Sequence, residues 1–281
     1  MKIVLAVDGS KYGRWATEWI VQVPFGKPPQ VTAIHVVDLT ALRASFVVQA
    51  MMVAYEGVLR DEEKRLETQA RRVAAETKAR LASLKVPAKV VIEKGPVVQT
   101  ILKRAGGPRN LVVLGDRGLS DLDRFFLGAV STQVALHAAC SVLVVKQPPR
   151  PLRRVLLAVD GSKASDRALQ FLLREMKPPA ENRIEVVVLH VLPPFAYAQV
   201  AVAGMVLSRR YAEKLAAAGY RVKERYVPGN AADEIVKAAA SQRADLIVAG
   251  AKGLGAVGRF FLGSVSSRVV RHSPCSILIV R

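Results

Sequence analysis

Residues 3–10 read IVLAVDGS, and residues 155–162 read VLLAVDGS. A longer pair of related stretches follows: residues 118–145 read GLSDLDRFFLGAVSTQVALHAACSVLVV, and residues 253–280 read GLGAVGRFFLGSVSSRVVRHSPCSILIV. Because the same residue types return in register across both pairs, the chain contains one structural unit twice. A length of 281 residues also suits two domains of ordinary size.

The spacing of the repeats sets the predicted domain boundaries. The copies are offset by 152 residues at the first pair of stretches and by 135 at the second, so the first copy carries about 17 extra residues in its middle. Between the copies lies QPPRP at 147–151, whose prolines cannot donate to a strand ladder and indicate a linker. We predict a first domain at residues 1–146, a linker at 147–152 and a second domain at 153–281.

Runs of valine, isoleucine and leucine predict five strands in each copy. Most runs lack polar alternation, which is typical of strands buried on both faces of a parallel sheet that helices cover. The predicted strands of the first copy are residues 2–7, 31–37, 88–93, 111–114 and 141–146, and those of the second are residues 154–159, 184–191, 221–227, 245–249 and 275–280.

The segments between the strands have helical spacing. Residues 58–84 predict a long charged helix with leucine or valine every seventh residue. This spacing leaves a coiled coil open, but the run is short for a sustained heptad, and we favour an amphipathic helix on the sheet. Asn230 is the predicted N-cap of a later helix. Apolar residues at i, i+3, i+4 and i+7 indicate one further helix in each copy, around Val98, Ile101, Leu102 and Ala105 and around Ala232, Ile235, Val236 and Ala239.

Alternating strands and helices predict the fold class. The pattern indicates an α/β protein with two tandem, doubly wound, five-stranded parallel-sheet domains. In such sheets, ligands bind beyond the carboxyl ends of the strands, where the winding direction reverses. The residues that follow the first and fourth strands of each copy are therefore the candidates for a site.

A glycine-rich segment follows the fourth strand of each copy. The first reads GDRG at 115–118, then nine residues, then GAVS at 128–131; the second reads GAKG at 250–253 and GSVS at 263–266. Glycines allow positive φ and close approach of backbone amides to an anion, and the second cluster begins a helix whose unpaired amides attract phosphate. The hydroxyl groups of Ser264 and Ser266 add donors, and the nearby cations that offer countercharge are Arg117, Arg124, Lys252 and Arg259.

Each first strand ends in an acid, Asp8 or Asp160, within the sequence VDGS. If the fourth strand lies beside the first, this carboxylate faces the glycine loop, where it suits donors on ribose or adenine better than phosphate. Ser10 and Ser162 are predicted N-caps of the first helix of each copy. Two plainer interpretations stay open: the acid satisfies turn amides, and the glycines serve only a turn.

The combined pattern resembles the universal stress protein family, in a tandem form with two such domains and in its ATP-binding branch. The resemblance covers nearly the whole chain twice. It implies a sheet of order 3-2-1-4-5, the adenine nucleotide alpha hydrolase-like arrangement, with ATP as ligand and any Mg²⁺ carried by the nucleotide. With Ser131 and Ser266 added from the loops, the implied binding residues are Asp160, Val191, Gly250, Gly253, Gly263, Ser264 and Val265, and in the first copy Asp8, Val36, Gly115, Gly118, Gly128, Ala129 and Val130.

The first copy departs from the family pattern at Ala129, where serine or threonine is usual. This change removes one hydroxyl group, and Asp116 adds negative charge to the same loop. We therefore predict weaker binding in the first copy and the stronger site in the second. Family members often pair through their last strands, so the resemblance implies a pseudo-dimer within this chain and leaves a homodimer open.

The function implied is a regulatory, ATP-binding protein of the stress response. No metal-ligand spacing, nucleophile elbow or P-loop ending G-K-[ST] is present, so at most slow ATP hydrolysis is expected. An enzyme that hydrolyses ATP or transfers adenylate stays open as an alternative. A nucleic-acid-associated protein is a second alternative, resting only on the formal net charge of +19.

The remaining features favour structural roles and a cytoplasmic location. Two pairs of histidines and one pair of cysteines recur between the copies, and we interpret them as parts of the shared fold: His35 with His190, His137 with His272, and Cys140 with Cys275. Two cysteines build no disulfide framework. The apolar run at the start is too short for a signal peptide, and residues 46–55 are about half the length that a bilayer requires. We expect no membrane partner.

Overall fold

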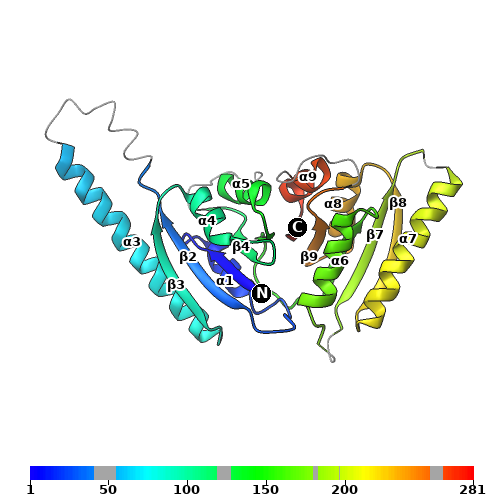
Figure 1. Ribbon diagram of the computed structural model, residues 1–281, viewed down its shortest axis with the longest axis horizontal. Helices are drawn as coiled ribbons and strands as arrows, with labels where there is room; N and C mark the ends of the chain where they lie inside the picture. Colours follow the sequence, from blue (N-terminus) through cyan, green and yellow to red (C-terminus); the bar gives the residue numbers. More distant parts are fainter. Residues whose placement is uncertain (41–54, 119–127, 180–182, 196, 254–261) are drawn as a thin grey trace.

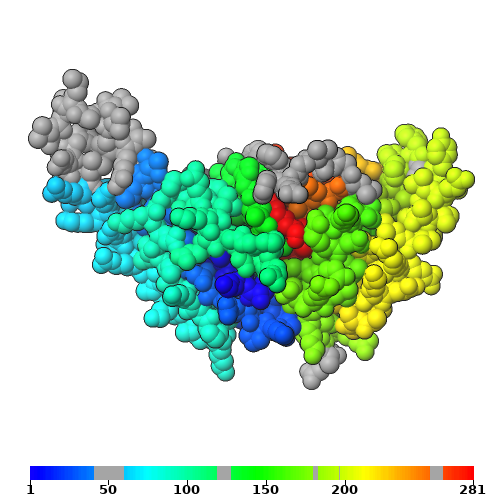
Figure 2. Space-filling view, in the orientation of Figure 1, coloured from blue at the N-terminus to red at the C-terminus, as the bar shows by residue number. Residues whose placement is uncertain are grey.

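The computed structural model describes residues 1–40, 55–118, 128–179, 183–195, 197–253 and 262–281, and all structural statements below concern these residues. One broad sheet crosses the molecule, with the first half of the chain on one side and the second half on the other (Figure 1). The red C-terminal residues are visible at the centre, between the two halves (Figure 2).

The sheet has ten strands in the order β3-β2-β1-β4-β5-β10-β9-β6-β7-β8. Each half thus has the order 3-2-1-4-5, and all pairs within a half are parallel. This confirms the predicted fold class, and β4 lies beside β1 as the site required. The bounds are β1 (Lys2–Ala6), β2 (Gln30–Val37), β3 (Ala88–Lys94), β4 (Leu111–Gly115), β5 (Ser141–Val145), β6 (Arg154–Val159), β7 (Glu185–Leu192), β8 (Arg221–Pro228), β9 (Leu246–Gly250) and β10 (Ser276–Val280).

The two halves join through their last strands, which pair antiparallel. Leu143 in β5 stands opposite Leu278 in β10, and these two leucines occupy equivalent positions of the repeat. The pairing therefore has an approximate two-fold relation, and it forms the pseudo-dimer expected within one chain. A homodimer of whole chains stays a prediction.

Helices cover both faces of the sheet. Buried apolar residues of α1, α3, α6 and α7 belong to the core layer on one face, and those of α4, α5, α8 and α9 to the layer on the other. The predicted long charged helix is α3, which packs on β2 and β3 as expected. The two longest helices lie at the outer ends of the molecule, beyond β3 and β8 (Figure 1). The bounds are α1 (Lys11–Trp19), α3 (Tyr55–Ser83), α4 (Val97–Ala105), α5 (Ala129–His137), α6 (Lys163–Glu175), α7 (Ala198–Ala217), α8 (Ala231–Ser241) and α9 (Ser264–His272).

Side chains cap the helices that the sequence indicated. The hydroxyl oxygen of Ser10 accepts from the Gly13 amide at 3.0 Å, and that of Ser162 accepts from the Ser165 amide at 3.2 Å. The Asn230 side chain accepts from the first-turn amides of α8, so all three predicted caps are confirmed. The helices α5 and α9 differ, because their N-caps are glycines and no side-chain cap bond forms there among the described residues.

The core consists of two apolar layers, one on each face of the sheet, and both layers continue across the β5–β10 junction. Every residue of β5 and β10 is buried, as the uninterrupted apolar runs predicted. Cys140 and Cys275 are free and buried in this core, which confirms their structural interpretation. Burial raises the pKa of both thiols, that of Cys275 to about 12. Among the described helices, none combines the length and apolar character needed to cross a bilayer.

Candidate functional site

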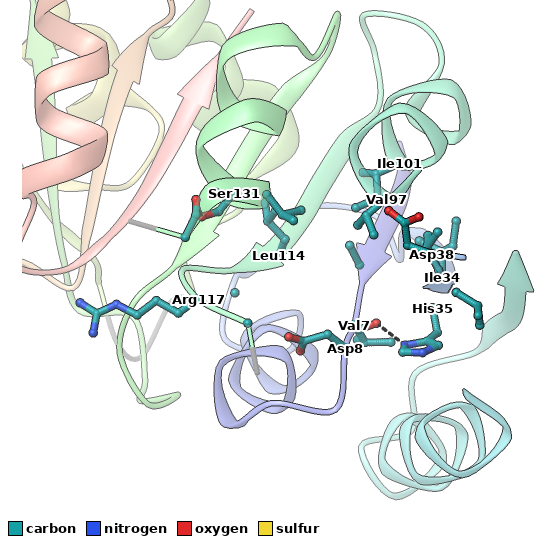
Figure 3. A pocket seen from close by; sticks show the side chains of 18 of the residues that line it. Val7, Asp8, Ile34, His35, Asp38, Val97, Ile101, Leu114, Arg117 and Ser131 are labelled. Carbon is teal, nitrogen blue, oxygen red and sulfur yellow. Dashed lines mark hydrogen bonds between the residues drawn. The ribbon is translucent and has the colours of Figure 1, made fainter. Parts of the chain in front are cut away.

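A cavity of about 350 Å³ opens in the first half, at the carboxyl ends of β1, β2 and β4 (Figure 3). The winding of the sheet reverses at this place. β1 lies between β2 and β4, and α1, which follows β1, covers the opposite face from α5, which follows β4. All eight binding residues predicted for this half line the cavity: Asp8, Val36, Gly115, Gly118, Gly128, Ala129, Val130 and Ser131. The fold thus brings together residues from four separate segments of the chain.

The carboxylate of Asp8 is fixed between the first helix and the glycine loop. The Ser10 amide donates to Asp8 Oδ1 at 2.9 Å, so the acid does satisfy a turn amide. A Cβ atom on Gly13 would lie 2.8 Å from Oδ1, and one on Gly118 would lie 2.9 Å from Oδ2. A side chain at either position would have to displace the Asp8 carboxylate. The close contact keeps Asp8 and the loop backbone on the same wall of the cavity.

The described glycines of the loops allow neighbouring segments to pack closely, and none of them has a positive φ. The glycines with positive φ are elsewhere: those at the strand ends are Gly9 at +83° and Gly161 at +79°. A Cβ on Gly115 would lie 2.6 Å from the Tyr12 main chain, and one on Gly250 would lie 2.5 Å from that of Ala164. Gly115 and Gly250 therefore let the first helix of each half pack against the fourth strand. The sequence-based expectation of positive φ in the loop is wrong for the described glycines.

The serines of the second glycine cluster hold the loop to the strand end. In the first half, the Ser131 hydroxyl donates to the Asp116 carbonyl at 2.6 Å. In the second half, the Ser266 hydroxyl donates to the Gly250 carbonyl at 2.8 Å. Both serines are buried, whereas Ser264 at the start of α9 is exposed. Ser131 and Ser266 thus position the backbone around the cavity.

The far side of the first cavity is an apolar slot. Val36 from β2 and Val97 and Ile101 from α4 line it, and Figure 3 shows Asp38 beside Val97. The His35 ring nitrogen Nδ1 contacts the Val7 carbonyl at 2.8 Å, and His190 makes the same contact with the end of β6, so this pair has a shared structural role.

Asp38 is a polar group in this slot that the sequence analysis missed. Burial opposes ionisation, yet hydrogen bonds from Thr40 and the Val97 amide hold the pKa of Asp38 below its usual value. The Thr40 amide donates to Asp38 Oδ1 at 2.8 Å. The only sequence signal was an acid directly after the second strand. The corresponding residue of the second copy is Pro193, so the two cavities differ at this edge.

The second half contains a smaller cavity, of about 100 Å³, at the equivalent place. The Ser162 amide donates to Asp160 Oδ1 at 3.0 Å, and a Cβ on Gly253 would lie 2.7 Å from Oδ2, which repeats the contacts of the first half. Gly263 and Ser264 do not line this cavity, although they begin α9 beside it. The predicted residues that do line it are Asp160, Val191, Gly250, Gly253, Val265 and Ser266.

The two cavities differ in charge. In the first loop, Asp116 is buried, with Arg117 Nε at 3.5 Å and Lys146 Nζ at 3.9 Å from its carboxylate. In the second loop, alanine stands in place of this acid, and the structure gives the buried ammonium of Lys252 no hydrogen-bond partner among the described residues. Lys252 lines the second cavity. The first cavity is the larger, and its loop carries an acid that the second loop lacks. The stronger site in the second half stays a prediction.

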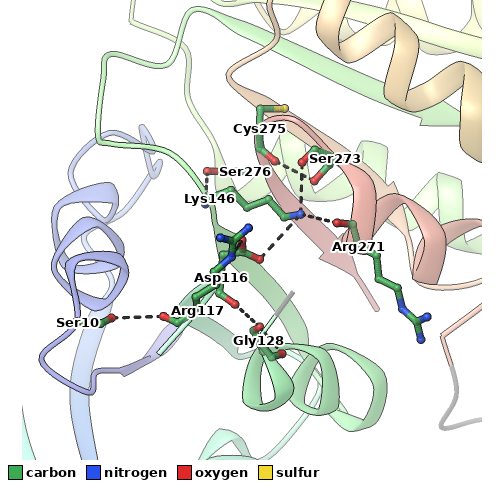
Figure 4. Close-up of polar contacts among 10 residues, drawn as sticks. Ser10, Asp116, Arg117, Gly128, Lys146, Arg271, Ser273, Cys275 and Ser276 are labelled. Carbon is green, nitrogen blue, oxygen red and sulfur yellow. Dashed lines mark hydrogen bonds and ion pairs between the residues drawn. The ribbon is translucent and has the colours of Figure 1, made fainter. Parts of the chain in front are cut away.

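Arg117 lines the first cavity, and its guanidinium lies beside Asp116 near the junction between the halves (Figure 4). Its guanidinium also lies 5.8 Å from the centre of the Tyr12 ring. The other two cations named as countercharge, Arg124 and Arg259, lie outside the described residues. Among the described residues, no three histidine, cysteine or acidic side chains gather as a metal site would require.

Comparisons with known proteins agree on one family. The model of the universal stress protein family matches residues 1–146 and again residues 151–281. A universal stress protein of Mycolicibacterium smegmatis is 27% identical over 298 aligned residues, covering 99% of this chain and 96% of that protein. One from Thermus aquaticus is 36% identical over 138 residues, covering 46% of this chain and 98% of the relative.

A solved structure of similar fold also spans the chain. The crystal structure of a universal stress protein from Archaeoglobus fulgidus has a TM-score of 0.71 and 22% identity, covering all of this chain and 98% of the other. At this identity the likeness concerns the fold alone. Since the family model matches both halves, the chain belongs to the universal stress protein family and carries two of its domains in tandem.

Proposed function

We propose that this protein binds ATP at the switch point of each half and has a regulatory role in a stress response. The observation that carries the proposal is the contact of Asp8 with Gly118, repeated by Asp160 with Gly253. In each half, a carboxylate at the end of the first strand meets a loop that leads to a helix with a glycine N-cap. Carboxylates accept from ribose hydroxyl groups, and open helix amides bind phosphate. The two ends of one nucleotide thus have complementary partners.

The base is assigned to the apolar slot between the second strand and the following helix. In the first half this slot contains Val36, Val97 and Ile101, and in the second half it contains Val191 and Ile235. Aromatic bases lose unfavourable contact with water when they enter such a slot. A volume of about 350 Å³ in the first half falls within the range of small-molecule pockets.

The phosphates are assigned to the glycine loops and the first turns of α5 and α9. A helix N-terminus carries about half a positive charge, and no side chain competes there among the described residues. In the second half, the Lys252 ammonium adds a full charge with no acid beside it in the loop. The backbone amides that we assign to phosphate belong to Ala129 and Val130 at the start of α5, and to Gly253, Ser264 and Val265 in the second half. The Gly128 and Gly263 amides already donate to the Asp116 and Ala251 carbonyls and hold the loops in place. Any Mg²⁺ arrives with the nucleotide.

Isothermal titration calorimetry of the full chain with ATP, ADP and AMP tests the proposal. We expect two sites, with affinity that rises with the number of phosphates, most steeply in the second half because of Lys252. Equal binding of all three nucleotides would contradict a site that reads phosphate, and absence of heat with all three would reject the proposal.

The alternatives have their own readouts. Steady-state ATP turnover that disappears in Asp160→Ala would favour an enzyme. Nucleic-acid binding that survives high salt would favour the basic-protein alternative, because purely electrostatic binding fades steeply with salt. The domain boundaries, 1–146 and 153–281 around a linker at 147–152, and a cytoplasmic location complete the proposal; protease cleavage within the linker and cell fractionation test them.

A further inference from the structure

Each half of the molecule caps the helix that begins at the other half's binding loop. Lys146 follows β5, and its Nζ donates to the carbonyl oxygens of Arg271 at 3.2 Å and Ser273 at 3.3 Å, at the C-terminal end of α9 (Figure 4). Arg281 follows β10, and its guanidinium donates to the carbonyls of Ala135 at 2.6 Å and Leu136 at 3.1 Å, at the end of α5. Cations stabilise helix C-termini because they meet unpaired carbonyls and the negative end of the dipole.

The two caps are not equivalent. Lys146 also lies 3.9 Å from the carboxylate of Asp116, which belongs to the first binding loop. The second loop has Ala251 at that position, so Arg281 has no such acid to contact. The Lys146 side chain is only 9% exposed, so water screens its interactions little. Lys146 is therefore shared between the first loop and the end of α9, whereas the Arg281 guanidinium donates to carbonyls at the end of α5 and to that of Cys140, and not to the described residues of the second loop.

The Asp116 main chain also belongs to the first site. The Gly128 amide and the Ser131 hydroxyl both donate to the Asp116 carbonyl, and these bonds join the first loop to the start of α5. At the other end of the contact, α9 has nine residues and begins at Gly263 beside the second cavity. A short chain of contacts thus connects the first loop, through Asp116 and Lys146, to the helix whose N-terminus faces the second site.

We propose that Lys146 couples the two nucleotide sites and that this coupling is antagonistic: phosphate bound at the first loop weakens binding at the second. Negative charge arriving at the first loop adds to that of Asp116 and attracts the Lys146 ammonium toward the first half. The α9 carbonyls then lose their donor, the last turn of α9 loosens, and its first-turn amides hold phosphate less firmly. The coupling is reciprocal, as linkage requires. It rests on the proposed function, because it needs a nucleotide at each site.

The first experiment measures MgATP binding at the second site by calorimetry, with the first site open or closed. Gly118→Val closes the first site, because its Cβ would lie 2.9 Å from the Asp8 carboxylate. We expect the second site to bind at least about fivefold more tightly in Gly118→Val than in the doubly occupied wild type, the lower end of typical coupling. In a Lys146→Met background this difference should disappear. Arg281→Met is the matched control: it removes the other cap and should leave the difference intact.

Hydrogen exchange gives a readout that does not depend on affinity at the second site. In Gly253→Val, where only the first site is open, MgATP should speed amide exchange in the last turn of α9, and this effect should vanish in the double variant with Lys146→Met. If Lys146→Met does not fold, Asp116→Asn breaks the same link and retains the cap. Three results would overturn the coupling and leave the two proposed sites intact. The second site could bind MgATP equally well with the first site open or closed, or it could bind more tightly when the first site is occupied. Amide exchange in the last turn of α9 could also be the same with and without MgATP. Absence of MgATP binding at both sites would overturn the proposed function as well.

Discussion

A Cβ atom on Gly253 would lie 2.7 Å from Oδ2 of Asp160. This separation is shorter than any ordinary contact, so a side chain at position 253 would have to displace the Asp160 carboxylate or the loop after β9. The same relation joins Gly118 to Asp8 in the first half. Each pair brings together residues more than ninety positions apart, and each defines one wall of a candidate nucleotide site.

Gly253→Val should remove nucleotide binding from the second site. The added side chain must displace either the Asp160 carboxylate or the loop, and both contribute to the proposed site. Calorimetry with ATP should show one site in place of two. Gly107→Ala is the matched control, since its Cβ would meet no described atom within 4 Å, and it should keep both sites. Two sites of unchanged affinity in Gly253→Val would refute the role of this contact.

Gly250→Ala should destabilise the fold far more than Gly263→Ala. The first Cβ would lie 2.5 Å from the Ala164 main chain, whereas the second would lie 3.5 Å from its nearest neighbour, an ordinary contact. Overpacking of this kind costs about 1–3 kcal/mol. Urea denaturation of both variants measures the difference in the free energy of unfolding. Similar losses in the two variants would show that α6 and β9 can separate without cost.

Lys252→Met should weaken ATP binding at the second site by about tenfold or more, in line with the ~1.5–3 kcal/mol of a hydrogen bond to a charged group. Adenosine, which lacks phosphate, should bind equally well to both proteins. The same change should raise the melting temperature of the nucleotide-free protein, because the Lys252 ammonium is buried with no hydrogen-bond partner in the part of the chain that the structure describes, and burial of such a charge is costly. Lys89→Met, at an exposed position of β3, is the control. If adenosine and ATP lose affinity alike, Lys252 does not contact phosphate.

Cys275 should resist thiol reagents in the native protein. With a pKa of about 12 caused by burial, on the order of one thiol in ten thousand is ionised at pH 8. Labelling with a chromogenic disulfide should be slow in buffer and complete in denaturant. The raised pKa also makes stability depend on pH. The contribution of Cys275 to the free energy of unfolding is complete below the ordinary thiol pKa of 9.0. It is lost as pH rises toward about 12, because only the unfolded chain releases the thiol proton in that range. Fast native labelling at pH 8 would contradict this burial.

The sequence predicted features that depend on local chemistry. The sequence located all ten strands to within a residue or so at each end. The signal was an uninterrupted apolar run in β4, β5, β9 and β10, which are buried on both faces, whereas in the edge strands β3 and β8 apolar residues alternate with exposed polar residues. Ser10, Ser162 and Asn230 were recognisable as caps, since a short polar side chain before a helix bonds the nearby amides. The repeated acid and glycine loop indicated where a site would lie, because the strand order places β1 beside β4.

Other features depend on side chains that meet only after folding. The sequence did not predict that position 115 must be glycine, because this depends on how closely α1 packs on β4. It also did not predict the carboxylate of Asp38 in the apolar slot. The sequence also did not indicate that the Lys252 ammonium is buried, because a lysine after a strand is usually exposed.

The sequence by itself determined the repeat, the family, the order of the elements and the positions of the candidate sites, because each follows from patterns within a short stretch of chain. Only the tertiary structure decided how the two halves act on one another. Lys146 meets the end of α9 across more than a hundred residues, and this contact exists because β5 and β10 pair antiparallel and carry the residues after them into the opposite half. Such a contact has no signature in either repeat alone.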